Sequence, residues 1–109
     1  MSKALEKSEP YIRLLARSGP KRRKLLLNQA TKEELKSLCE ICLNILKGNI
    51  PLDDNNFRRL KRNKSTIKTL ANKRISLKVK KDIVNQRGGF LGTVASIALP
   101  LLASLFAAK

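Results

Sequence analysis

The sequence predicts an all-α protein, a small bundle of short helices followed by a separate apolar C-terminal helix. Apolar residues recur at helical intervals in several segments, and no stretch of useful length alternates apolar and polar residues as a strand would. Charge divides the chain in two, since residues 1–87 carry 23 of the 24 Lys and Arg and all eight Asp and Glu. We therefore expect a basic helical domain over 1–87, and a Gly-Gly hinge with an apolar helix over 88–109.

The N-terminal part predicts two helices. Residues 1–17 form a loosely amphipathic pattern, and Pro10 favours an ordered start at that position because proline is tolerated in the first turn of a helix. Gly19 and Pro20 break the pattern. A short helix is expected over 21–27, where four basic residues run into three leucines.

The best-specified helix begins after Thr31. Thr31 and Glu34 have the spacing of a capping box, in which each side chain accepts a hydrogen bond from the other residue's backbone N–H. Apolar residues follow at helical spacing, namely Leu35, Leu38, Cys39, Cys42, Ile45 and Leu46. Gly48 is expected just beyond the C-terminus, and Pro51 holds Ile50 in an extended connector.

The segment 55–81 contains eleven basic residues and no acidic one. Apolar residues recur there at helical intervals, so we expect short helices around Phe57, Ile67 and Leu77. Asn63 or Ser65 is the expected cap of the middle helix and Ser76 that of the last one, while Phe57 is expected in the core. An exposed helix face normally mixes both charge signs, so this asymmetry favours a polyanion-binding surface over an ordinary solvated one.

The apolar segment 90–108 would be about 28 Å long as a helix, at about 1.5 Å per residue, which is close to the hydrocarbon thickness of a bilayer. Pro100 predicts a kink, because it removes a backbone donor from the middle of the helix. A membrane-spanning, membrane-inserting or oligomer-forming tail is the favoured interpretation. The alternative is a buried C-terminal helix of a globular core.

No catalytic or metal-binding constellation is visible. The chain has no His, and Cys39 and Cys42 lack the two further ligands that a zinc site needs, so we expect buried, reduced thiols, no cofactor and no enzymatic activity. Asp53 and Asp54 more simply cap a helix than form a catalytic pair. The N-terminus lacks an apolar signal segment, which is consistent with a reducing compartment.

The net charge of +16 implies a polyanionic partner, because self-repulsion opposes a compact state unless it is neutralised. DNA, RNA and acidic lipid would each neutralise this charge, so the charge alone does not choose among them. Aromatic residues that stack on bases are nearly absent, so binding to phosphates through counterion release is expected. The candidate phosphate contacts are Lys21, Arg22, Arg23, Lys24, Arg58, Arg59, Lys61, Arg62, Lys64, Lys68, Lys73, Arg74, Lys78, Lys80 and Lys81.

Several segments resemble a short basic protein of Polinton/Maverick elements and adintovirus-like double-stranded DNA viruses. They are LLAR (14–17), PKRRKLL (20–26), LCE (38–40), NILKGNIPL (44–52), KRISLK (73–78) and QRGGFLG (86–92). The last third is also similar in composition to the precursor of the adenovirus minor core protein, although that protein is arginine-dense and lacks the capped, cysteine-containing helix. The resemblance implies a DNA-condensing role in the virion interior, or in the host nucleus during assembly, with double-stranded DNA as the partner.

The resemblance also implies maturation by a protease that cuts after Gly-Gly, which makes Gly88 and Gly89 a candidate cleavage site. Gln86 stands where such proteases prefer Met, Leu or Ile. Contact of the apolar tail with capsid protein, with itself or with membrane completes this interpretation. The main alternative is a membrane-active or tail-anchored virion protein whose basic body binds acidic lipid, and an RNA-binding accessory protein is a third possibility.

Overall fold

The computed structural model describes the chain over residues 3–107, and its side chains over residues 5–100. All the regular elements of the described chain are helices and none is a strand, which confirms the predicted all-α class. Its elements are α1 (Lys3–Lys7), α2 (Glu9–Arg17), α3 (Pro20–Asn28), α4 (Lys32–Leu46), α5 (Asp54–Lys61), α6 (Lys64–Ala71), α7 (Leu77–Arg87), the 3-10 helix η1 (Gly88–Phe90) and α8 (Leu91–Ala107).

Local side-chain caps explain where three of the helices begin. At α4 the capping box is complete, because the Thr31 N–H donates to Glu34 Oε1 (2.9 Å) and the Glu34 N–H donates to Thr31 Oγ1 (3.1 Å). Asp53 caps α5, and Ser76 caps α7. Asn63 precedes α6 as predicted but makes no side-chain cap, since its amide donates back to the Arg59 carbonyl.

Gly48 ends α4 in the way the sequence predicts. Its φ of +74° lies in the left-handed region, which a residue with a Cβ enters only with strain. In this conformation the Gly48 N–H donates to the Ile45 carbonyl (3.1 Å), and the Asn49 N–H donates to the Asn44 carbonyl (3.0 Å). These two bonds satisfy carbonyl groups that the end of a helix otherwise leaves unpaired.

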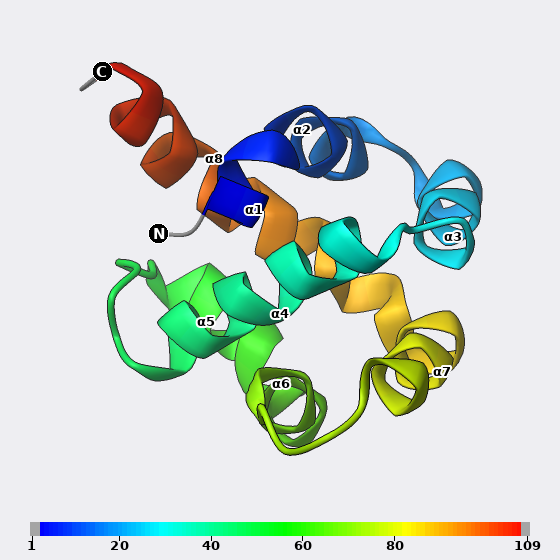
Figure 1. The fold of residues 1–109 in the computed structure, drawn as a ribbon. Coiled ribbons are helices and arrows are strands. Elements are labelled where there is room, and N and C mark those ends of the chain that lie inside the picture. The colour runs from blue at the N-terminus through cyan, green and yellow to red at the C-terminus, as the bar shows by residue number, and fades with distance from the viewer. Residues whose placement is uncertain (1–2, 108–109) are drawn as a thin grey trace.

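The helices are arranged around α8, which runs through the middle of the molecule (Figure 1). α2 packs along one side of α8 and α4 crosses it, while α5 also contacts it. α4 in turn packs against α1 and α6, and α3 packs against α7. The remaining helices therefore pack around the place where α4 crosses α8.

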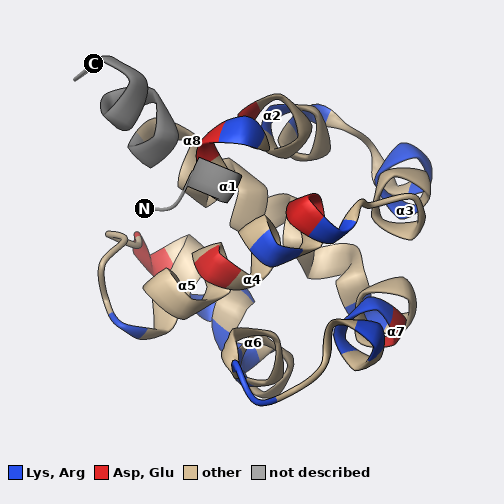
Figure 2. Ribbon diagram, in the orientation of Figure 1, with Lys and Arg blue, Asp and Glu red and all other residues tan. Residues whose placement is uncertain are grey.

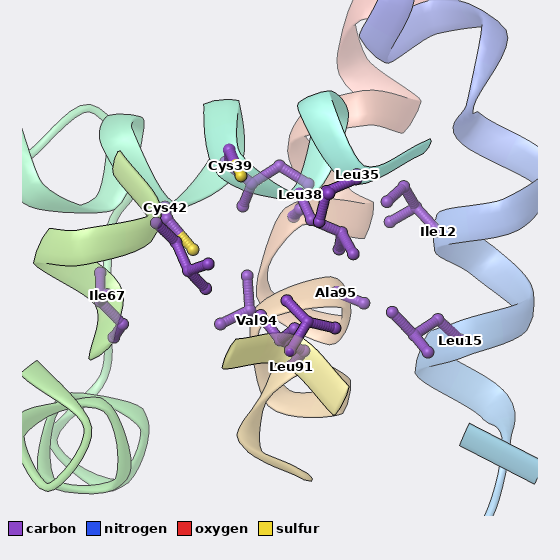
Figure 3. Close-up of a cluster of buried hydrophobic side chains, with 14 of the residues drawn as sticks. Ile12, Leu15, Leu35, Leu38, Cys39, Cys42, Ile67, Leu91, Val94 and Ala95 are labelled. Carbon is purple, nitrogen blue, oxygen red and sulfur yellow. The ribbon is translucent and has the colours of Figure 1, made fainter. Parts of the chain in front are cut away.

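The C-terminal helix was expected to be separate from the basic body, and the structure differs from this expectation. Leu91, Val94 and Ala95 are fully buried, and Figure 3 shows Ala95 pointing toward Leu15 of α2 and Val94 on the side toward Cys42 of α4. Leu35, Leu38 and Cys42 of α4 close the same cluster from the other side. The segments before and after residue 87 thus share one core, because the uncharged helix supplies the apolar surface that the basic helices need for their own burial.

Protein covers the apolar face of α8. Leu91, Val94 and Ala98 are buried on this face, whereas the side chains after residue 100 lie outside those that the structure describes. α8 continues through Pro100 to Ala107. Across the described residues, no helix combines the length and apolar character required to cross a membrane.

Both thiols lie in the core, as the sequence predicts. Cys39 and Cys42 are free and buried on the inner side of α4. Burial disfavours the thiolate, so the pKa of each thiol is raised, although the nearby Lys80 ammonium partly opposes this shift. The two cysteines therefore act as small apolar side chains in the folded protein.

Replacing Leu91 by Ala tests whether α8 is part of the core. We expect Leu91→Ala to lower the free energy of unfolding by about 2–5 kcal/mol, because it leaves a cavity at a fully buried position. Urea denaturation measures the change, and Leu25→Ala is the matched control because Leu25 is 59% exposed. Equal stability of the two variants would mean that α8 does not support the rest of the fold.

The buried thiols predict a specific dependence of stability on pH. Their pKa is raised in the folded protein, so the thiols begin to ionise only in the unfolded chain as the pH passes about 8.5. Stability from this source is complete below that pH and is lost above it, by up to about 1.4 kcal/mol per pH unit for each thiol. We expect urea denaturation between about pH 7.5 and 9.5 to give a shallower decline for Cys42→Ala than for the unmodified chain. If stability fell equally with pH in both proteins, the buried Cys42 thiol would not be the source of the pH dependence.

Candidate nucleic-acid interface

Twelve of the fifteen predicted phosphate contacts are exposed on the folded chain. These are Lys21, Arg22, Lys24, Arg58, Arg59, Lys61, Arg62, Lys64, Lys68, Lys73, Arg74 and Lys78. We refer to this set as the basic surface. Its side chains are exposed to solvent, so each cation contacts a phosphate without first breaking a buried interaction.

The fold places the segments of the basic surface next to one another. α5 contacts α6, α6 contacts α7, and α7 contacts α3, so the four helices follow one another around the molecule. Figure 2 shows Lys and Arg along this series of helices, and also in the connection between α6 and α7. Residues that lie up to 57 positions apart in the sequence, such as Lys21 and Lys78, therefore belong to neighbouring helices.

Acidic residues lie at the edges of this surface. Asp53 and Asp54 stand at the start of α5, and Asp82 lies on α7, all three exposed. The other acidic residues belong to α1, α2 and α4 (Figure 2). A polyanion that follows the basic surface thus meets few carboxylates, whose like charge would weaken its binding.

Arg23 holds the fold together and is not a free phosphate contact. Its Nη1 donates to the Gly89 carbonyl (3.1 Å) and its Nη2 donates to the Ser18 carbonyl (3.0 Å), so one side chain joins the end of α2 to η1. The guanidinium lies directly over Gly92, so that a Cβ added there would overlap Arg23 Cζ. The missing side chain of Gly92 therefore leaves room for this guanidinium.

Lys81 also has an internal role. Its ammonium donates to the carbonyl groups of Leu27 (2.7 Å) and Ala30 (3.2 Å), which end α3. A cation at a helix C-terminus satisfies orphan carbonyls and complements the negative end of the helix dipole. Desolvation lowers the pKa of Lys81, and Glu34 partly opposes this shift. This lysine therefore stabilises the contact between α7 and α3.

Lys80 is the third predicted contact that the structure places elsewhere. Only 5% of the residue is exposed, so an external phosphate does not reach it while the chain is folded. It lies at a pocket of about 390 Å³ between α4, α6 and α7, with Cys39 and Leu43 in the same wall. The helical period of α7 explains this position, since Lys80 and Val84 are four residues apart and both face inwards.

The candidate cleavage site lies inside a helical turn. Gly88 and Gly89 form η1, and Gly88 is buried where an added Cβ would stand 2.9 Å from Leu27 Cδ1. Gly89 is exposed, but its carbonyl accepts the hydrogen bond from Arg23. Proteolysis at this site requires the turn to open locally, because chain cleavage proceeds from transiently opened states. Cleavage after Gly89 stays a prediction.

The prediction that Phe57 belongs to the core is wrong. Its residue is 55% exposed on α5, although Leu60, three positions further on, is buried. The helical spacing of apolar residues identified the correct helix but not how far its apolar face extends beyond the core.

Among the described residues, no group of three or more His, Cys, Asp and Glu side chains forms a possible metal site.

No protein-family model matches the chain, and neither a curated protein nor a solved structure matches it. The likeness to proteins of Polinton elements and adenoviruses therefore stays a prediction from the sequence. The function has to be argued from the arrangement of charge on the fold.

Arg22 and Arg23 provide a matched pair for separating binding from folding. Arg23→Ala loses two charge-assisted hydrogen bonds, so we expect it to lower the free energy of unfolding by about 1–3 kcal/mol. Arg22→Ala changes an exposed side chain and should stay within about 0.5 kcal/mol of the unmodified chain. Thermal and urea denaturation measure both values. Equal stability of the two variants would contradict the structural role of Arg23 and would make it an ordinary surface cation.

Proposed function

We propose that this protein is a non-enzymatic DNA-condensing core protein of a virus or virus-like transposon, and that it acts by neutralising genome phosphates. The observation that carries the proposal is the basic surface, in which twelve exposed cations occupy adjacent helices. Nine of them fall within 55–81, where no acidic residue interrupts them. An ordinary solvated helix surface mixes both signs, whereas a phosphate-binding surface does not.

The mechanism follows from counterion release. Each Lys or Arg that contacts a phosphate displaces condensed cations from the DNA, so affinity depends on the number of contacts and falls steeply with salt. Contacts of this kind position a protein on the duplex but carry no sequence information. The basic surface therefore supports binding along any stretch of genome, as condensation requires.

Double-stranded DNA is proposed over RNA because of the sequence resemblance to proteins of double-stranded DNA viruses and transposons. Phosphate contacts alone are common to both nucleic acids. The same resemblance supports a location in the virion interior, or in the host nucleus during assembly. Hydrophobic contact with capsid protein is assigned to the apolar sequence 101–108, which follows the residues of α8 that the core buries.

The membrane-active alternative receives less support from the fold. Insertion of α8 into a bilayer would withdraw Leu91, Val94 and Ala95 from contact with α2 and α4. This would expose the inner faces of the basic helices to water, at a cost proportional to the apolar area that is uncovered.

The salt dependence of DNA binding tests the proposal. We expect the quadruple variant Arg58→Gln, Arg59→Gln, Arg62→Gln and Lys64→Gln to lower the slope of log K against log salt by about three to four, at roughly 0.9 per phosphate contact. Fluorescence anisotropy with a long duplex of mixed sequence over a salt series gives the slope.

The matched control removes the same charge from outside the basic surface, by replacing Lys7, Arg17, Lys32 and Lys47 with Gln. All four residues are exposed, so neither variant is expected to lose more than about 0.5 kcal/mol of stability per substitution. A fall in slope of equal size in both variants would show that net charge, and not the basic surface, determines binding. An unchanged slope in the first variant would refute the claim that the basic surface contacts the DNA phosphates.

A further inference from the structure

The end of α4 and the start of α5 carry an unusual apolar surface. Phe57 is 55% exposed and Leu46 is 41% exposed, and both residues line a groove of about 220 Å³. Leu52, Leu60 and Ile67 also line the groove, together with Lys61 and Lys64. An isolated exposed apolar side chain needs no explanation, but an exposed aromatic ring beside an open apolar groove is a surface with both a projection and a recess.

A surface with both parts is complementary to itself. In a two-fold symmetric pair, the same patch of each molecule meets its copy, so a ring that projects from one molecule enters the groove of the other, and the reverse contact forms at the same time. Aromatic side chains are the ones that most often anchor such contacts, because they bury a large area and lose little conformational freedom.

Charge along α5 sets the orientation of the pair. Asp54 lies three residues before Phe57 and Lys61 lies four residues after it, about 4.5 Å and 6 Å along the helix axis at roughly 1.5 Å per residue. In an antiparallel pair centred on Phe57, each Asp54 therefore stands opposite the second copy's Lys61. The Asp54 carboxylate is exposed and forms no ion pair with any other described residue, so it is available for this contact.

We propose that a second copy of this chain occupies the groove, with α5 packed antiparallel against α5 and Phe57 inserted beside Leu46 and Leu52 of the other molecule. The patch is small, so the association is weak and is populated at high protein concentration. Arg58 and Arg59 lie on α5 and Arg62 is its C-cap, so a dimer carries two copies of the basic surface, related by its two-fold axis. Dimer formation does not depend on the proposed function, but it would give a condensing protein two duplex-binding sites.

Sedimentation equilibrium of the intact chain tests the proposal. The measurement is made at micromolar to millimolar protein in about 0.3 M salt, where a screening length of roughly 5 Å reduces repulsion between the two positive bodies. We expect a reversible monomer–dimer equilibrium. Phe57→Ala should lower the association constant at least tenfold, while Leu25→Ala, which removes an equally exposed side chain from α3, should leave it unchanged.

Charge reversal separates this contact from an effect on folding. D54K and K61D should each weaken the dimer, and the double variant D54K/K61D should restore it, because the opposite charges then face each other again. Both reversals oppose the dipole of α5, so a folding effect would make the double variant the weakest of the three. That result, or a monomer at every concentration, would overturn the proposal. So would a Phe57→Ala variant that loses affinity for single-stranded DNA without any change in mass, since the ring would then act by stacking on bases.

Discussion

The burial of α8 is the constraint on which the rest of the structure depends. A chain of 109 residues with a net charge of +16 and 4% aromatic residues has little apolar bulk and strong self-repulsion. Its longest uncharged segment supplies what the basic helices lack. Leu91, Val94, Ala95 and Ala98 fill the centre of the molecule, so that helices rich in Lys and Arg bury their few apolar residues and keep their charge at the surface.

The same constraint gives some cations a structural task. Arg23 fixes η1, the turn that leads into α8, and Lys81 fixes α7 against the end of α3. Arg23 bonds to carbonyl groups at the end of α2 and in η1, and Lys81 bonds to those at the end of α3. The positive charge thus has two functions, one inside the structure and one on its surface.

The sequence predicted the features that depend on neighbouring residues and missed those that depend on distant ones. The capping box at Thr31 and the left-handed turn at Gly48 are set within a few positions, and both were predicted correctly. Periodicity identified the apolar face of α8 but could not show that α2, some 80 residues earlier, covers it. The role of Arg23 was hidden for the same reason, because its partner Gly89 lies 66 residues away. The twelve exposed cations were predictable from composition, since an unpaired Lys or Arg rarely enters a core.

The central claim is that a folded helical body, and not a disordered basic chain, carries the charge that neutralises DNA. The most direct test is a titration of the intact chain with long double-stranded DNA over a salt series, with helix content followed by circular dichroism in the same samples. We predict a steep negative dependence of log K on log salt, little preference for sequence, and unchanged helix content on binding. An absence of binding at low salt, or helices that form only when DNA is added, would contradict the account.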